Sequence, residues 1–276
     1  MRFTLTASIA LITFFSSCDK DEPQILETDP TEMPPSVVEK RVMVELFSSI
    51  RCGSCPRAHH FMDQTEIQDP KVFHITHQMF GGNPMRHGYT KYVQESVKSV
   101  QFTPHAIIQR NVSDGAVQYY EPERYEEIST LIGDRDLVVE LNATVKENDN
   151  ALDIALDMLA FDDAIQKLSV TVLLVEKKVV GNDYDYHQRN YGNEDPDHPY
   201  YQQGDYIERF EHTNVIRELI TPFEGIEVDI TNNEASYTLN HDLEGLAAEN
   251  FALVAFVSDL NSNQIFDARY IDLADL

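Results

Sequence analysis

Two cysteines separated by two residues, Cys52 and Cys55, are the side chains of this sequence best suited to chemistry. They lie in the stretch RCGSCPRAHH, directly after an apolar run. A pair with this spacing can exchange electrons between dithiol and disulfide forms, bind a metal ion, or crosslink a turn. The choice among these depends on the other cysteines and on the surrounding fold.

The number of cysteines narrows the choice. The chain has three, and the third, Cys18, is near the N-terminus. A structural zinc site of four thiolates is therefore excluded, and a disulfide that closes so short a loop removes little entropy from the unfolded chain. Thiol–disulfide exchange, which needs no cofactor, is the stronger interpretation.

The residues after the pair predict a helix over 57–67, with Pro56 suited to its first turn. Unpaired N–H groups at a helix start favour a thiolate. Cys52 is therefore predicted to have the lowered pKa and to attack disulfides, and Cys55 to resolve the mixed disulfide. Arg51 either adds positive charge beside this thiolate or is simply solvated.

Histidines offer a competing metal site. His59 follows the second cysteine by one helical turn, so these three side chains have the composition of a Cys2His copper site. A fourth ligand is not evident, because His74 and His77 are three apart on a predicted strand and face opposite sides. His105 is better placed. We predict exchange without a metal, and the sequence leaves metal binding near the pair open.

Apolar patterns around the cysteines predict alternating strands and helices. Strands are expected over residues 42–49, 71–78, 105–111 and 116–120, with helices also over 89–100 and 121–134. The stretch VSDG, residues 112–115, predicts a hairpin turn. Thr103 and Pro104 stand directly before the third strand.

This order, with CGSCP opening the first helix and Thr103-Pro104 opening a later strand, resembles the thioredoxin fold over residues 40–135. The resemblance implies a cis peptide bond before Pro104, packed against the cysteine pair. One departure is that thioredoxins commonly place a buried acid six residues before the first cysteine, where this sequence has Leu46. Glu45 points to the opposite face, so it is either a paired core acid or exposed at an edge.

From residue 136 onward the pattern changes to strands only. Strands at 137–146, 151–159, 168–180, 226–230, 235–239, 251–259 and 265–273 predict an all-β sandwich over 136–276. A long polar, Tyr-rich loop over 181–205 is either functional or disordered. Asp259, Asn261 and Asn263 are spaced like the start of a calcium loop, but Gln264 replaces the required Gly, so a hairpin turn is expected.

Charge is distributed unevenly along the chain. The net charge is −26, yet residues 40–135 carry 11 basic and 11 acidic side chains, whereas residues 136–276 carry 8 and 29. Nucleic acids and anionic lipid surfaces bind to basic patches. The composition therefore argues against both as partners of the acidic segment and fits solubility at a cell surface.

The N-terminal residues predict export and lipidation. Residues 1–17 have the composition of a secretory signal peptide, and FSSC, ending at Cys18, resembles a bacterial lipobox, at which the cysteine is acylated. The alternative is a soluble secreted protein with a chance cysteine. Residues 18–39 predict an extended acidic tether. Its charged run at 20–22 resembles the surface signal of Bacteroidota lipoproteins, or is a plain linker.

A lipobox, a thioredoxin-like segment and a β-sandwich together resemble the Omp28-related outer-membrane lipoproteins of Bacteroidota. The stretches that carry the resemblance are VMVELFSSIRCGSCPRAHH, TPHAIIQRN, YIERFEHTNVIRE and NFALVAFVSD. It implies an outer-membrane protein anchored through lipid at Cys18, on the surface or periplasmic side. The activity of that family is poorly defined, so the resemblance implies architecture more than mechanism.

The sequence therefore predicts a lipid-anchored envelope protein that exchanges thiols and disulfides with partner proteins. Cys52, Cys55 and Pro104 are the predicted catalytic residues, with Arg51, Thr103 and His105 as supporting residues. The alternative prediction is a non-catalytic surface-binding or adhesion protein, in which the acidic sandwich recognises the partner and the thioredoxin-like segment is a scaffold.

Overall fold

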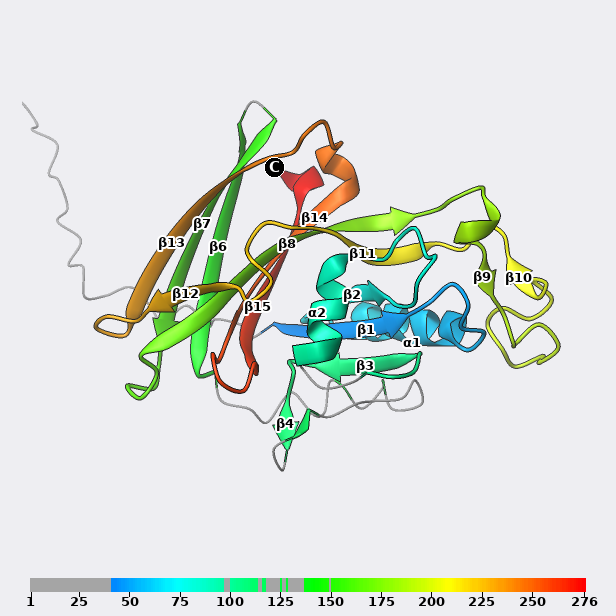
Figure 1. The fold of residues 1–276 in the computed structure, drawn as a ribbon, viewed down its shortest axis with the longest axis horizontal. Helices are drawn as coiled ribbons and strands as arrows, with labels where there is room; N and C mark the ends of the chain where they lie inside the picture. The colour runs from blue at the N-terminus through cyan, green and yellow to red at the C-terminus, as the bar shows by residue number, and fades with distance from the viewer. Residues whose placement is uncertain are drawn as a thin grey trace, which may run out of the picture. The chain divides into compact units, whose positions relative to one another are not determined.

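An eight-stranded mixed sheet forms the centre of the structure, which is a computed structural model (Figure 1). Its path is β15 (Ile265–Asp272), β14 (Phe251–Ser258), β8 (Lys167–Val179), β11 (His212–Leu219), β2 (Val72–Gln78), β1 (Val42–Ser48) and β3 (His105–Ile108), with β12 (Ile226–Asp229) also paired to β8. Strands β1 and β2 run parallel, and β3 is antiparallel to β1. The strands predicted around the cysteines therefore lie together at one end of this sheet.

The structure describes residues 41–96, 100–113, 116–117, 125, 128, 137–148 and 150–276. The predicted signal peptide, Cys18 and the tether lie outside the described residues. The end of the predicted fourth strand and all of the predicted helix at 121–134 except Tyr125 and Ile128 do so as well.

The sheet contains strands from both predicted domains, which differs from the expected division at residues 135 and 136. Strand β11 runs parallel to β2, with Val215 opposite Thr76, and antiparallel to β8. The described residues from Arg41 to the C-terminus accordingly lie in one compact unit. The apolar segments of the second half complete the sheet begun by the first half, because backbone pairing across β2 and β11 leaves no edge between them.

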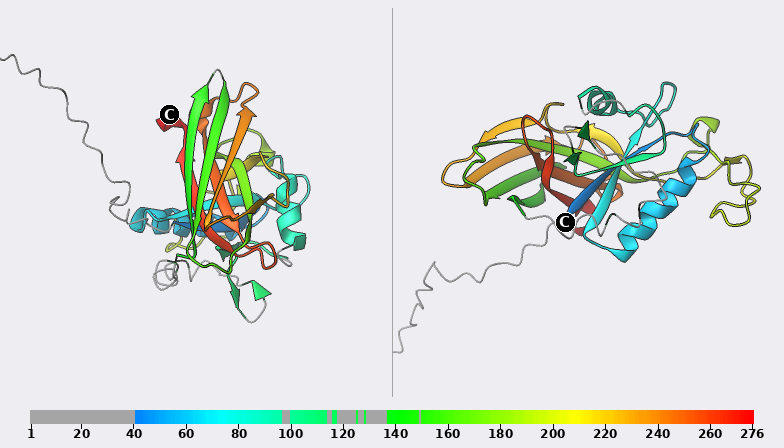
Figure 2. Two further views of the ribbon diagram at one scale, coloured as in Figure 1. Left: turned by 90° about the vertical axis from the view of Figure 1, so that its left-hand side faces the viewer. Right: turned by 90° about the horizontal axis from the view of Figure 1, so that it is seen from below.

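Two helices cover opposite faces of this sheet (Figure 2). They are α1 (Cys55–Gln68) and α2 (Gly88–Ser96). Alternate residues of β1 explain the arrangement, because Val44 and Leu46 pack with Met62 of α1, whereas Phe47 packs with Tyr89 of α2. All seven residues of β1 are buried, as the continuous apolar run predicts.

A second sheet packs against the other end of the large sheet. Its order is β13 (Glu234–Asp242), β7 (Ala151–Ala160) and β6 (Val139–Asn148). Buried residues alternate with partly or fully exposed residues along β7, and its buried side chains share one core with those of β8 and β14. The protein is therefore rich in β-structure, with several sheets, as expected.

The strands on either side of the predicted turn at 112–115 pair, although residues 114 and 115 lie outside the described residues, and the second predicted turn is present. β4 (Val112–Ser113) and β5 (Ala116–Val117) form an antiparallel hairpin. Between β14 and β15, the Asp259 carboxylate accepts hydrogen bonds from the backbone N–H groups of Asn261 and Ser262, at 3.0 and 2.7 Å. This carboxylate therefore stabilises a hairpin turn, as predicted. Within the described part of the chain, no helix is long and apolar enough to cross a membrane.

Candidate functional site: the cysteine pair and the segment that covers it

The cysteine pair lies in the turn between β1 and α1 and forms a disulfide with the two Cα atoms 5.4 Å apart. Cys55 is fully buried, and Cys52 is partly exposed. The helix begins at Cys55, with Ser54 as its N-cap, so the predicted position of Cys52 at the start of the helix was wrong. Cys52 instead occupies the preceding turn, and its carbonyl accepts a hydrogen bond from the N–H of Cys55 at 3.2 Å.

A cleft of about 450 Å³ brings the predicted proline segment to this turn. Gly53 and Ser54, between the two cysteines, line it together with Thr103, Pro104 and His105. The Thr103–Pro104 peptide bond is cis, which confirms that part of the prediction. Arg51 is exposed, and its guanidinium extends toward Gly82, where an added Cβ would lie 3.2 Å from Nη2.

The far wall of the cleft comes from the long loop predicted at 181–205. Tyr191, Gly192, Asp195 and His198 line it. The loop is structured, with a two-stranded sheet of β9 (Gln188–Arg189) and β10 (Tyr206–Ile207) at its base. Figure 1 shows these strands at the same end of the molecule as the turn between β1 and α1.

Gln188 fixes this loop to the cysteine turn. Its side chain is fully buried, and its Nε2 donates to the carbonyl oxygens of Cys52, at 2.8 Å, and Ser49, at 3.1 Å. Buried carbonyl groups need such partners. Two backbone bonds support the attachment, from the Arg189 N–H to the carbonyl of Ile50 and from the Tyr191 N–H to that of Gly53. We name residues 188–191 the clamp segment.

Close packing of the clamp segment requires glycine between the cysteines. A Cβ added at Gly53 would lie 2.3 Å from Cγ of the Tyr191 ring. We therefore expect Gly53→Ala to displace the ring and destabilise the protein by about 1–3 kcal/mol, as in other overpacked sites. Urea unfolding measures this loss.

The matched control for that substitution is Gly81→Ala, because an added Cβ there meets nothing within 4 Å. In a Tyr191→Ala background, which lacks the ring, the added Gly53→Ala substitution should cost much less stability than it does in the parent. Equal stability of Gly53→Ala and Gly81→Ala would contradict the described packing.

Glu45 is a paired core acid, one of the two alternatives expected for it. Both of its carboxylate oxygens accept hydrogen bonds from Arg110 at 2.8 Å, and His77 Nε2 lies 3.1 Å from Oε1. Burial alone would raise the pKa of Glu45, but Arg110 and His77 lower it to about 2. Glu45 shares the α2 face of the sheet with Tyr89, whose hydroxyl also contacts Arg110. It therefore lies on the opposite face from α1 and stabilises the core.

His59 does not join the cysteines in a metal site in this structure. Its Nε2 lies 3.0 Å from Ser48 Oγ, and its ring contacts those of His74, Phe210 and His212 edge-on. Burial, with the charges of the two neighbouring histidines, holds the pKa of His59 well below its usual range. His74 and His77 face opposite sides of the sheet, as predicted, because one contacts α1 and the other Glu45.

Sequence reasoning missed the clamp segment. Only the length and composition of the loop at 181–205 indicated a role, and neither identifies Gln188. Its partners are backbone carbonyls about 136 residues earlier in the chain, which leave no pattern in the side-chain sequence.

Comparison with solved structures shows a similar fold in HBP35 of Porphyromonas gingivalis, with a TM-score of 0.63 and 16% identity over 84% of this chain and 75% of that chain. A domain of the outer membrane lipoprotein Omp28 from Porphyromonas gingivalis gives a TM-score of 0.30 and 18% identity, over 49% and 87%. No curated protein matches the sequence.

Residues 94–269 match the family described as outer membrane protein Omp28. The match begins in α2 and ends in β15, so it includes the proline segment, the clamp segment and the three-stranded sheet, but not the cysteine pair or strands β1 and β2 of the large sheet. Because it covers more than half of the chain, the protein belongs to the Omp28 family, and its predicted outer-membrane location is confirmed.

Proposed function

We propose that this outer-membrane protein exchanges thiols and disulfides with partner proteins through Cys52 and Cys55. The observation that carries the proposal is the disulfide between a partly exposed and a fully buried cysteine at the start of α1. The segment from Thr103 to His105 lines the same cleft as the residues between the two sulfur-bearing positions. This difference in exposure suits a pair in which one sulfur forms the mixed disulfide with the partner protein and the other resolves it by re-forming the intramolecular disulfide.

The surrounding strands support a thioredoxin-like region. Parallel β1 and β2, antiparallel β3 and helices on both faces form the order that the sequence resemblance implies. The two facing sheets that share the second core support a sandwich-like remainder. In this proposal the remainder holds the redox turn through the clamp segment, so the two regions act as one body.

The atoms and electrons of the proposed exchange reaction balance without a cofactor. In the described oxidised state, a thiolate of a partner dithiol attacks the Cys52 sulfur, and the bond between Cys52 and Cys55 breaks, with Cys55 leaving as a thiolate. The second partner thiolate then attacks the partner sulfur of the mixed disulfide and displaces Cys52. The partner leaves oxidised by two electrons, and the two cysteines take up its two protons. The reverse sequence reduces a partner disulfide.

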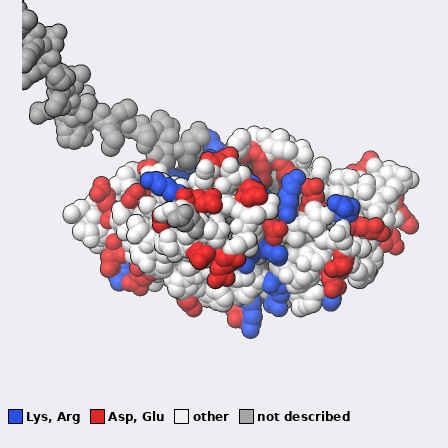
Figure 3. Space-filling model, turned by 90° about the horizontal axis from the view of Figure 1, so that it is seen from above, with Lys and Arg blue, Asp and Glu red and all other residues white. Residues whose placement is uncertain are grey.

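Envelope proteins with accessible thiols or disulfides are the proposed partners. Acidic side chains are widespread on the face in Figure 3, among fewer lysines and arginines. Such a surface supports protein partners over nucleic acid, which requires basic patches. Lipidation at Cys18, which lies outside the described residues, remains a proposal for how the protein is held at the membrane.

The test is catalysed reduction of insulin disulfides by dithiothreitol. We expect the protein to accelerate this reaction and the Cys52→Ser and Cys55→Ser variants to lose the acceleration, because neither can cycle through the intramolecular disulfide. Cys18→Ser is the matched control, since it removes a cysteine without touching the pair. If both pair variants retain the rate of the parent, the adhesion alternative replaces the exchange function.

A further inference from the structure

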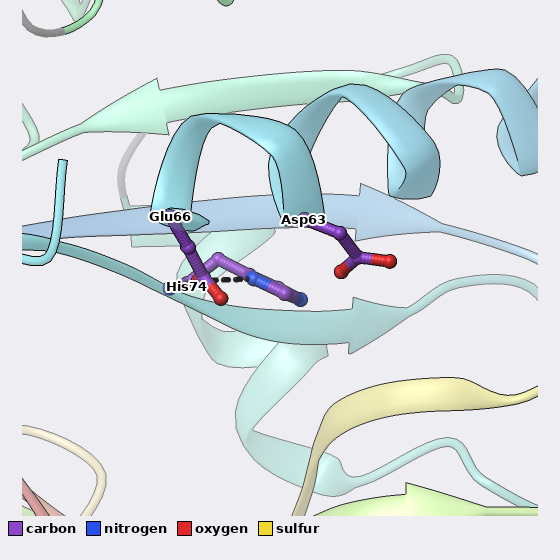
Figure 4. Close-up of side chains that lie close together, drawn as sticks. All are labelled: Asp63, Glu66 and His74. Carbon is purple, nitrogen blue, oxygen red and sulfur yellow. Dashed lines mark hydrogen bonds and ion pairs between the residues drawn. The ribbon is translucent and has the colours of Figure 1, made fainter. Parts of the chain in front are cut away.

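A cluster of metal-ligating side chains lies on α1 and β2, away from the cysteine pair. Asp63, Glu66 and His74 each offer a ligand atom within 4.8 Å of the others. Figure 4 shows both carboxylates directed from α1 toward the His74 ring on β2, Glu66 at one ring nitrogen and Asp63 at the other end. The His74 side chain is fully buried, and the carboxylates are partly buried, so this is not an ordinary solvated acidic face.

Glu66 fixes the orientation of the imidazole. Its Oε1 lies 2.5 Å from both the His74 Nδ1 and the His74 backbone nitrogen, which donate to it. With the proton held on Nδ1, the lone pair of the neutral ring is on Nε2, where Thr213 Oγ1 lies 3.1 Å away. A carboxylate bonded to one ring nitrogen is the arrangement that commonly orients a histidine whose other nitrogen binds a metal.

The Asp63 carboxylate is available as a ligand. Within the described residues, it forms no hydrogen bond or ion pair. Asp63 and Thr213 also line a cavity of about 370 Å³, together with Tyr200 and Glu211. This cavity gives an ion a path to the cluster and room for water ligands. The nearby ammonium of Lys178 is bonded to Glu211 at 2.9 Å and so does not occupy the position.

We propose that this cluster binds one divalent transition-metal ion of the zinc class. His74 binds through Nε2 and Asp63 through its carboxylate, while Glu66 orients the imidazole and water completes the coordination. Zinc lies about 2.0–2.2 Å from nitrogen and oxygen ligands in tetrahedral geometry, so two of its ligand atoms are about 3.4 Å apart. From separations of up to 4.8 Å, the ligand atoms need to close by at most about 1.4 Å, which a side-chain rotation of the partly exposed Asp63 can supply. Imidazole with carboxylate favours zinc over magnesium or calcium, which prefer oxygen ligands alone.

The site is separate from the disulfide and independent of the proposed exchange function. Asp63 and Glu66 follow Cys55 by eight and eleven residues on the same helix. A helix rises 1.5 Å per residue, so these side chains start roughly 12 and 16 Å along the axis from the pair. Metal binding can therefore be measured on a Cys18→Ser/Cys52→Ser/Cys55→Ser background, in which no cysteine thiolate can contribute.

The experiment is isothermal titration of zinc chloride into the untagged protein on that background, with excess magnesium present to occupy weak carboxylate sites. We expect one zinc ion per chain. Asp63→Asn and His74→Gln, which remove direct ligands, should abolish this event. Glu66→Gln should weaken it about 10–100-fold, as loss of an orienting carboxylate does elsewhere.

Glu95→Gln is the matched control, because this carboxylate is exposed on α2 and outside the cluster. Unfolding without zinc identifies any variant that fails to fold, and the partly exposed Asp63→Asn retains every described hydrogen bond. Absence of zinc binding in the parent, or equal binding by parent and Asp63→Asn, would overturn the site and show that the cluster is only an ion-pair network.

Discussion

In the Cys55→Ser variant, partner proteins are expected to accumulate as disulfides with Cys52. Cys52 is partly exposed and can attack a partner disulfide, whereas the fully buried Cys55 is the thiol that would resolve the product. Without Cys55, the mixed disulfide has no intramolecular route to release. Non-reducing electrophoresis of envelope extracts, followed by mass spectrometry of the trapped species, measures the accumulation.

The matched control is Cys52→Ser, which leaves only the buried thiol. It should trap few or no partners, because Cys55 is fully buried in the first turn of α1. Alkylation of the reduced protein gives a second readout, in which the faster-reacting thiol of the pair should be lost in Cys52→Ser, because only Cys52 is partly exposed. Equal trapping and equal alkylation by the two variants would remove the distinction on which the mechanism depends.

Loss of Arg110 is expected to destabilise the protein by about 3–5 kcal/mol, because it leaves the buried Glu45 carboxylate without its main partner. Chemical unfolding of Arg110→Met at pH 7 measures the effect. A Glu45→Leu/Arg110→Met variant should lose less than the sum of the two single variants, because the double change removes the buried charge as well.

The effect of Arg110→Met should depend on pH. In the parent, the pKa of Glu45 is about 2, below its usual 4.5, so its contribution to stability is present above pH 4.5 and is lost as pH falls toward 2. In the variant, burial without the guanidinium raises this pKa, so stability is lost as pH rises through it. The difference between parent and variant is therefore largest at neutral pH and shrinks in acid.

An exposed ion pair supplies the control for this prediction. Lys91 and Glu95 lie one turn apart on α2 at 3.6 Å, with side chains 65% and 67% exposed. Lys91→Met should change stability by no more than about 0.5 kcal/mol, because water screens the pair. Comparable losses in Lys91→Met and Arg110→Met would contradict the assigned role of the buried network.

The elements around the cysteines were predictable because their signals are local. The buried run of β1, Pro56 at the start of α1 and Pro104 before β3 each restrict the backbone at their own position. Alternation along β1 likewise placed Glu45 on the face opposite Leu46, as observed. The sequence placed Cys52 at the start of the helix, three residues before the observed start at Cys55, because the ends of a helix are set by capping geometry that propensity resolves poorly.

Strand β11 was not predicted, although it joins the two halves of the large sheet. Its sequence, HTNVIREL, has polar residues at positions that are buried in the structure. His212 Nε2 contacts the carbonyl of Tyr186, and Asn214 accepts a hydrogen bond from the Tyr270 hydroxyl. A hydrophobicity pattern predicts a loop for such polar residues, because the hydrogen-bond partners that allow them to be buried are distant in the sequence.

Contacts between distant residues also limited the prediction of the cysteine site with its clamp segment and of the proposed metal site. The contact of Gln188 with the cysteine turn, and that of His74 with Asp63 and Glu66, join residues that are distant in the sequence or on different elements of the fold. The i, i+3 spacing of the two carboxylates on α1 was readable, but the strand residue that faces them depends on the packing of α1 on β2.

The reduction potential of Cys52 and Cys55, measured by equilibration with glutathione buffers, tests the proposed exchange function most directly. Oxidoreductases of this chemistry have potentials between about −270 and −120 mV, whereas structural disulfides in exported proteins lie below about −300 mV. We predict a value within the first range, because exchange requires the pair to be converted between its dithiol and disulfide forms in the envelope. A value below about −300 mV would contradict the proposal and leave the pair as a structural crosslink.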